Sequence, residues 1–219
     1  MNAGLSNLGT LKAWLLPASL TGTDYDAQVL GIGLGVAAQL ERHCVRDFAR
    51  TVGATHECDA ARRSILVRRF PIEEVTDIDL REAGAAVDAW SEQSLGEVDQ
   101  IQHDSGLIEL AGPFGSWRDR LRITYTGGYW WNQQESAYTP PVTPTDEDPD
   151  LSVIPEGAKA LPADLLLAWK LQCEHVWAQR DKLGTNIGAK PGSAPSLALI
   201  ELLPVVKEIL RTYIRYDLV

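Results

Sequence analysis

The sequence has little of what marks secreted and membrane proteins. Its 219 residues include three cysteines, at positions 44, 58 and 173, which are too few for a disulfide framework. The N-terminal stretch lacks the basic and then apolar pattern of a signal peptide. The longest apolar run, residues 29–40, is far too short to span a bilayer. We therefore expect a protein that is made and kept in a reducing cytoplasm and that has no membrane contact.

Positive charge is also scarce. The chain has 30 acidic and 20 basic side chains, which give a net charge of −10. This is the wrong sign for a protein that grips the phosphate backbone of a nucleic acid, although it suits a surface past which DNA slides without binding. With 45% hydrophobic and 23% charged residues, the composition is that of one ordinary globular domain with room for a subdomain.

Signatures of catalysis are missing as well. The sequence contains no G-x-S-x-G, H-E-x-x-H or Walker motif. Asp77 and Asp79 share one face of a predicted strand, but catalytic carboxylate pairs need burial to shift their pKa values, so a solvated face is the favoured interpretation. We expect no enzyme activity, and a small metal- or nucleotide-dependent enzyme is the least favoured alternative.

Two short clusters suggest zinc, because imidazole and thiolate are common zinc ligands. They are His43-Cys44 and His56-x-Cys58. The paired-ligand spacing of a zinc finger is absent, and Cys44 falls on the apolar stripe of a predicted helix. Cys173 lies two residues from a histidine on another predicted helix, and residues so spaced point to different faces. We therefore expect no metal and no cofactor.

A long helix is predicted from Val29 to Phe48, where apolar residues recur every three or four positions over about six turns. Within it, Gly31, Gly33 and Gly35 form G-x-G-x-G. A dinucleotide-binding fingerprint needs a preceding strand and a helix that begins at the glycines, and neither condition holds. The alternative is close packing against another helix, in the same chain or in the next subunit, since each glycine costs about 1 kcal/mol of helix propensity. Gly31 and Gly35 are therefore predicted interface residues.

The middle of the chain changes to short alternating segments that predict strands. The candidate strands are residues 64–70, 75–81, 98–103, 106–111 and 121–126. After Pro162, apolar residues at Leu166, Trp169 and Cys173 line one face of a predicted helix. We therefore predict an α+β fold in which long antiparallel helices form a bundle core and a small antiparallel β subdomain is inserted.

This fold divides the chain into four parts. Residues 1–63 form the N-terminal helices of the bundle, 64–131 the β-rich insertion, 132–160 an extended loop rich in proline and acidic residues, and 161–219 the C-terminal helices with a tail. A second irregular loop is expected at 184–196. Whether the two loops reach partners or only connect helices stays open, because loops of such length are usually functional or disordered.

Two stretches carry a resemblance to a known family. They are RITYTGGYW at residues 122–130 and LPADLLLAWKLQCEHVWAQRD at residues 161–181. A strand that ends in an aromatic-flanked Gly-Tyr, followed after a loop by proline, an aliphatic helix and Arg-Asp, resembles the head-tail connector (adaptor) proteins of tailed bacteriophages. The resemblance implies a ring of twelve subunits that docks beneath the portal. It also implies that double-stranded DNA passes through the lumen without specific binding.

The C-terminal segment is apolar and basic in an acidic protein. Its simplest interpretation is a last helix that closes the core. The resemblance implies instead that the end of the chain inserts between portal subunits. The predicted portal-binding residues are Lys207, Arg211, Tyr213, Ile214, Arg215, Tyr216, Leu218 and Val219.

Several of the seven tryptophans lie in turns and at strand ends, where aromatic side chains are costly to leave exposed and are enriched at interfaces. With the two glycines above, Trp90, Trp117, Trp130 and Trp131 are the predicted subunit or partner contacts. We therefore expect a structural protein of the virion neck that is held in the host cytoplasm until assembly and that binds the portal, itself and a stopper or tail-completion protein. The alternative is that this chain is itself the stopper or tail-completion protein.

Overall fold

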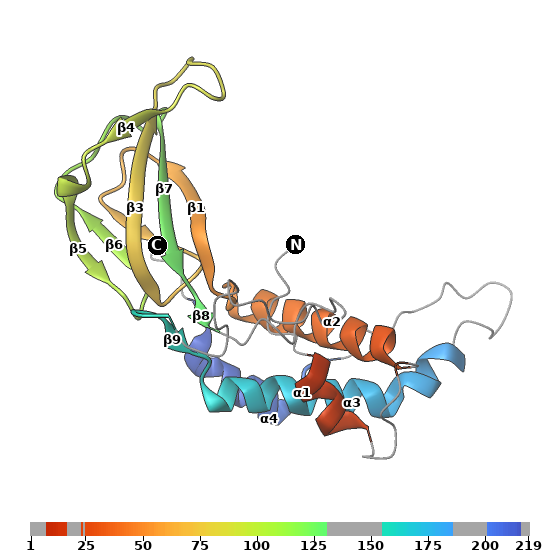
Figure 1. Ribbon diagram of the computed structural model, residues 1–219. Coiled ribbons are helices and arrows are strands. Elements are labelled where there is room, and N and C mark those ends of the chain that lie inside the picture. Colours follow the sequence, from red (N-terminus) through yellow and green to blue (C-terminus); the bar gives the residue numbers. More distant parts are fainter. Residues whose placement is uncertain (1–7, 17–22, 24, 131–154, 186–200, 216–219) are drawn as a thin grey trace, which may run out of the picture. The chain divides into compact units, whose positions relative to one another are not determined.

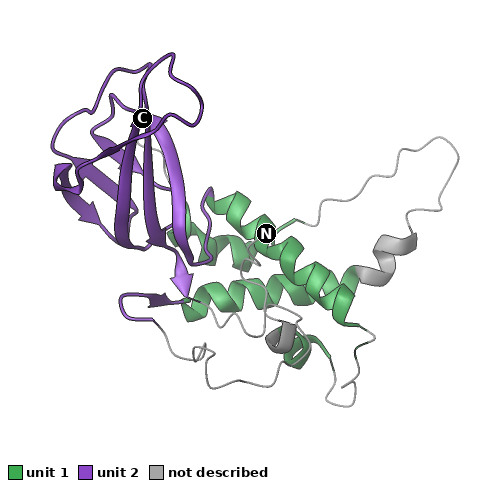
Figure 2. Cartoon of the chain, turned by 45° about the horizontal axis from the view of Figure 1, so that its top comes forward, with its two compact units in different colours: residues 1–44, 132–153, 161–214 green, residues 45–131, 154–160, 215–219 purple. Residues whose placement is uncertain are grey.

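The computed structural model describes residues 8–16, 23, 25–130, 155–185 and 201–215 of the chain. It divides them between two compact units, coloured separately in Figure 2. The helical unit takes residues from 1–44, 132–153 and 161–214, and the β unit takes residues from 45–131, 154–160 and 215–219. Each unit is therefore built from segments that are far apart in the sequence, and each is described by itself below.

Among the described residues, the helical unit contains four α-helices (Figure 1). Their bounds are Leu8–Leu15 for α1, Asp26–Cys44 for α2, Ala163–Thr185 for α3 and Pro204–Leu210 for α4. Helix α2 packs on α3, α3 on α4, and α1 on both α2 and α3. The 3₁₀ turn η3, Arg211–Tyr213, follows α4 directly. Among the described residues, none of these helices combines the length and the apolar character that crossing a membrane requires.

The β unit contains a four-stranded, a three-stranded and a two-stranded sheet. The first has the order β1-β7-β3-β4 and is antiparallel, and the second has the order β2-β6-β5 and is also antiparallel. Strands β8 and β9 pair in parallel. The strand bounds are Thr51–Asp59 (β1), Ser64–Leu66 (β2), Ile72–Arg81 (β3), Ser91–Gln93 (β4), Val98–Gln102 (β5), Leu107–Leu110 (β6), Arg120–Gly127 (β7), Tyr129–Trp130 (β8) and Lys159–Ala160 (β9), and the 3₁₀ turn η1 covers Leu95–Glu97.

A hydrophobic core of twelve buried residues lies inside the β unit. Strand β7 contributes Leu121, Ile123 and Tyr125, the residues whose alternation predicted this strand. Strands β3 and β6 add Ile78 and Ile108, both fully buried. Alternation places the apolar side chains of each strand on one face, so the sheets enclose a core with no contribution from a helix.

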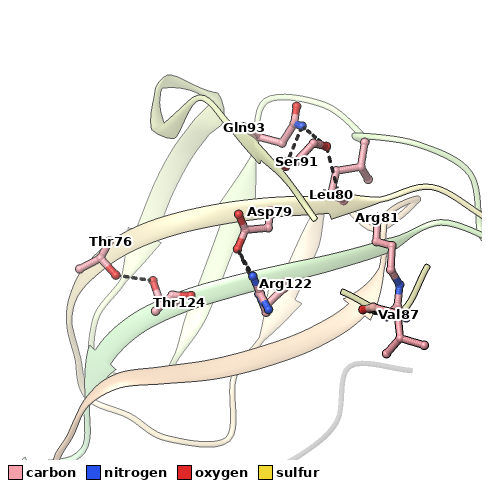
Figure 3. Close-up of polar contacts among 9 residues, drawn as sticks. All are labelled: Thr76, Asp79, Leu80, Arg81, Val87, Ser91, Gln93, Arg122 and Thr124. Atoms are coloured by element: carbon pink, nitrogen blue, oxygen red, sulfur yellow. Dashed lines mark hydrogen bonds and ion pairs between the residues drawn. The ribbon is translucent and has the colours of Figure 1, made fainter. Parts of the chain in front are cut away.

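Polar cross-strand pairs stabilise the four-stranded sheet outside its core. In Figure 3, Arg122 on β7 points to Asp79 on β3, which lies directly opposite in the register. The guanidinium donates from Nε and Nη2 to Asp79 Oδ2 at 3.0 and 2.8 Å. Arg50 makes a similar pair with Glu73 at 2.7 and 2.8 Å. Hydrogen-bonded pairs of this kind are the stronger class of surface ion pair.

The predicted fold class, α+β with a bundle core of long antiparallel helices and an inserted β subdomain, is wrong. Strands make up a share of the described chain similar to that of helices and have a core of their own. Two of the four α-helices are short, with eight residues in α1 and seven in α4. No bundle of long helices therefore forms the core of the part of the chain that the structure describes.

The helix predicted to reach Phe48 stops earlier for a local reason. Helix α2 ends at Cys44, and Val45 takes a φ of 54°, a left-handed value that a β-branched residue rarely adopts and that ends a helix. Phe48 is fully buried in the β unit instead. Strand β1 then begins at Thr51, in a stretch for which the sequence predicted no strand.

Candidate partner-binding surfaces

One groove on the β unit is lined mostly by residues of two strands. Its cavity volume is about 480 Å³. Residues 56–59 of β1 form one side and residues 64–66 of β2 the other, while Arg62, Arg120 and Arg215 also line it. Nothing in the sequence marked this groove, because its two sides come from a strand that the sequence did not predict and from one predicted to be longer.

Arginines outnumber carboxylates in the groove, with Arg62, Arg120 and Arg215 against Glu57 and Asp59. Arg120 Nη1 pairs with Asp59 at 2.9 Å, and Arg215 Nη2 donates to the Leu66 carbonyl at 3.0 Å. Burial lowers the pKa of His56, and the guanidinium groups of Arg215, Arg62 and Arg68 lower this pKa further. The charges that act on the imidazole are therefore positive, although the net charge of the chain is −10.

The same groove has little capacity for nucleophilic or metal chemistry. Burial raises the pKa of Cys58 to about 11, so the thiol stays protonated at neutral pH, whereas nucleophiles and metal ligands are thiolates. In the helical unit, burial raises the pKa of Cys173 to about 12. Among the described residues, no three His, Cys, Asp or Glu side chains are grouped so that they could hold a metal ion.

The two aspartates considered as an acid-base pair differ in their surroundings. Asp79 is half-buried and held by Arg122 in the cross-strand pair of Figure 3. Asp77 is exposed. A β-bulge lies between Val75 and Asp77 in the pairing of β3 with β7, which changes the alternation just before the two carboxylates.

The predicted C-terminal contact residues are partly engaged within the chain. Lys207 and Arg211 are exposed, and Arg211 lies 3.7 Å from Glu208. Tyr213 donates its hydroxyl to Asp164 Oδ1 at 2.6 Å, and Ile214 is half-buried. The last described residue is Arg215, which donates to the β2 carbonyl given above. Tyr216, Leu218 and Val219 lie outside the described residues.

The predicted aromatic contacts fall in three different settings. Trp90 is half-buried between two guanidinium groups, with Arg122 at 4.4 Å and Arg81 at 4.7 Å from its ring centroid. Trp130 lies in β8, paired with Ala160 of β9. Trp117 is 69% exposed, a large fraction for a tryptophan, and carries only Arg118 over its ring at 5.0 Å among the described contacts. Trp131 lies outside the described residues.

The two predicted glycine contacts lie on one exposed face of α2. Gly31 and Gly35 are both exposed, and no described atom lies within 4 Å of where a Cβ would be at either position. Leu34, 40% exposed, and Ala38 lie on the same face. Between the two glycines, Gly33 faces the interior instead, where its carbonyl accepts a hydrogen bond from Trp169 Nε1 at 3.1 Å. We call residues 31, 34, 35 and 38 the small-residue face of α2.

Comparisons with known proteins give a fold but no family. No protein-family model matches the sequence, and no curated protein matches it significantly.

Among solved structures, a chain from the neck of an empty gene transfer agent (GTA) particle, computed with C6 symmetry, is similar. Its TM-score is 0.57 and its identity 14%, over 100% of this chain and 93% of that chain. A chain of the native GTA virion has a TM-score of 0.56 and 15% identity, over 100% and 94%. A chain from the native GTA neck, computed with C12 symmetry, has a TM-score of 0.50 and 16% identity, over 98% and 97%. The fold of this chain is therefore shared, over nearly its whole length, with chains of GTA particles.

Proposed function

We propose that this chain is a structural neck protein of a phage-like particle, a head-tail adaptor that forms a ring beneath the portal. The observation that carries the proposal is the fold shared with chains of GTA necks, which covers almost all of both chains. A likeness limited to one subdomain would support only a common building block. A likeness over the full length supports a common overall role as an analogy of fold.

The proposed ring has twelve subunits and closes by cyclic symmetry, with one face of each subunit binding a different face of the next. Two of the similar chains belong to necks computed with C6 and C12 symmetry. The net charge of −10 suits a lumen through which DNA moves without being held. In this role the chain has no catalytic step, and its work is to bind the portal and present a surface to the next neck or tail protein.

The small-residue face of α2 is the surface we assign to the next subunit. Glycine in the middle of a helix costs about 1 kcal/mol of propensity at each position. Within the described chain nothing approaches Gly31 or Gly35 closely enough to use the space that they leave. Close approach of a neighbouring subunit would use it, and exposed Leu34 would be buried in the same contact.

Electron microscopy of the purified protein, alone and mixed with its portal, tests the proposal. We expect rings that stack coaxially on the portal. A monomer that ignores the portal but binds a tail component would support the alternative of a stopper or tail-completion protein. A monomer purified with bound zinc or nucleotide would overturn both structural assignments.

A double variant separates ring formation from folding. Gly31→Leu with Gly35→Leu adds side chains where no described atom lies within 4 Å, so the monomer should fold at least as stably as the wild type. The ring should be lost because the face is filled. Ala13→Leu, which places the same side chain at an exposed position of α1, is the matched control and should keep the ring. Intact rings in the double variant would show that another surface makes the subunit contact.

A truncation tests the proposed portal anchor. Tyr213 and Arg215 have hydrogen bonds within the chain, so a cut before them would damage the fold as well as any anchor. Removing residues 216–219 keeps both contacts. We expect this variant to form rings in electron micrographs and to lose coaxial stacking on the portal. Portal stacking equal to that of the full chain would assign the anchor to other residues.

A further inference from the structure

The groove on the β unit lies between two strands that follow each other in the chain but do not pair. Strand β1 ends at Asp59 and β2 begins at Ser64, and strands joined by so short a turn usually form a hairpin. Here β1 pairs with β7 and β2 pairs with β6, so each is the outer strand of its own sheet. Both strands line the groove. Two sheet edges therefore border one cavity.

An edge strand offers unpaired backbone groups. Along such an edge every second residue directs its N–H and C=O away from the sheet, which makes it a template for another strand. The groove is bordered by residues 56–59 on one side and 64–66 on the other. At a rise of about 3.3 Å per residue, these edges are roughly 10–13 Å long, which matches an extended segment of three or four residues.

The side chains around the groove favour an acidic segment. Arg62 and Arg215 lie at the groove with Arg120, against Glu57 and Asp59, and Asp59 is already paired with Arg120. The side chain of Arg62 is exposed and makes no hydrogen bond or ion pair in the described part of the chain, whereas its backbone amide donates to the Asp59 carbonyl at 3.2 Å. Guanidinium groups bind carboxylates through planar, two-pronged hydrogen bonds. Cys58 and Ile65 add buried apolar surface between the charges.

We propose that the groove between β1 and β2 is a strand-addition site that binds an extended acidic peptide segment of a partner chain. The backbone of the segment pairs with the edge of β1, because the Leu66 carbonyl on the edge of β2 already accepts from Arg215, and the carboxylates of the segment bind Arg62. In such sites main-chain hydrogen bonds give affinity and alternate side chains give specificity. The proposal holds for any oligomeric state of this chain, so the failure of the ring experiment and the failure of this one are distinguishable.

The experiment measures binding of a fluorescent seven-residue peptide of alternating Asp and Val to the full-length protein by fluorescence anisotropy. We expect saturable binding that weakens strongly with salt, because the charges of the site are partly exposed. The same peptide N-methylated at alternate backbone nitrogens keeps its carboxylates but loses its edge-facing donors, and should bind at least about tenfold more weakly. A peptide of alternating Lys and Val should not bind.

Two variants make the result specific to the groove. Arg62→Glu reverses a charge at the groove on an exposed side chain and should weaken binding of the Asp-Val peptide by about tenfold or more. Arg118→Glu makes the same change on another exposed loop and should leave the affinity unchanged. Amide hydrogen exchange should show new protection in β1 and β2 when the peptide is bound.

The following outcomes would overturn the proposal. Equal binding of the N-methylated peptide would mean charge attraction without strand addition. Equal loss in the Arg62→Glu and Arg118→Glu variants would mean a general effect of net charge. Absence of binding, or protection on strands other than β1 and β2, would mean that this groove takes no acidic strand.

Discussion

In the β unit, neighbouring strands close an apolar core, whereas in the helical unit buried polar side chains tie together segments that are far apart in the chain. Trp169 on α3 donates to the carbonyl of Gly33 on α2. Gln172, fully buried, donates to the Glu201 carbonyl at 3.2 Å and accepts from the Leu203 amide at 3.0 Å. The β unit also has a buried arginine, Arg46, which donates to the Phe70 carbonyl and stacks on the Phe70 ring at 3.5 Å from its centroid.

The two units differ in how the hydrogen bonds of their backbone groups are made. Strands satisfy their backbone groups through the sheet ladder, and in the β unit Arg46 and Arg69 bond carbonyls that lie outside the strands, those of Phe70 and Ala49. The segment that leads into α4 has no ladder, and its backbone groups at residues 201 and 203 are bonded by a side chain of α3. Polar side chains in the helical core therefore supply specificity in addition to packing.

The largest expected effect comes from replacing Trp169, whose indole links α3 to the Gly33 carbonyl of α2. Trp169→Ala removes a fully buried ring and its hydrogen bond to Gly33, and should lower the free energy of unfolding by about 3–5 kcal/mol. Trp169→Phe keeps most of the packing and should cost less, because it loses chiefly the hydrogen bond and part of the ring. Denaturant unfolding curves measure both. A loss of less than about 1 kcal/mol in the alanine variant would show that Trp169 contributes little to the stability of the helical unit.

A second pair of substitutions compares the two units directly. Gln172→Leu keeps the side-chain volume but leaves a carbonyl and an amide without their partner, so we expect a loss of about 1–3 kcal/mol. Tyr125→Phe in the β core removes only a hydroxyl that accepts from the Arg69 amide at 3.3 Å, and should cost about 0.5–1.5 kcal/mol.

The same unfolding measurement decides the comparison. If Tyr125→Phe proves the more destabilising of the two, side-chain hydrogen bonds matter more in the β unit than in the helical unit, and the distinction drawn above fails.

This difference also explains what the sequence could predict. Alternation of Leu121, Ile123 and Tyr125 predicted β7, because a strand with one buried face shows its period directly. Strand β1 was missed because its inward residues, Ala54, His56 and Cys58, are small or polar and give no apolar alternation. The groove depends on β1, so it could not be predicted either.

In the helices, too, the sequence predicted only some of the buried side chains. On α3, Trp169 and Cys173 are fully buried as predicted, but so is Gln172, which the apolar pattern did not include. Trp14 on α1 is 44% exposed, with its Nε1 donating to Glu174 at 3.2 Å. Side chains whose place depends on a partner distant in the chain are not visible in local periodicity. The sequence showed the glycines of α2, but it did not show whether they face the solvent or the interior.

The smallest effect concerns pH and belongs to the β unit. Burial and three nearby arginines lower the pKa of His56 below its usual value of 6.5. As the pH falls through about 6.5, the unfolded chain therefore binds a proton at this residue before the folded chain does, and the folded state loses stability. The loss ends once the pH is below the lowered pKa, where both states are protonated. His56 should thus stabilise the fold relatively more at pH 7 than at pH 5.

The charged groups that act on His56 are Arg62 and Arg215, which line the groove, and Arg68, which lies outside it; the carboxylates of Glu57 and Asp59 also line the groove. His56→Gln removes the titrating group, so unfolding free energies measured between pH 7 and pH 5 should fall less steeply in this variant than in the wild type. Identical slopes would show that the imidazole titrates as it does in the unfolded chain. A slope in the wild type that becomes shallower when the acidic peptide is added would link His56 to the groove, because a bound carboxylate favours the imidazolium and raises the pKa that the arginines lower.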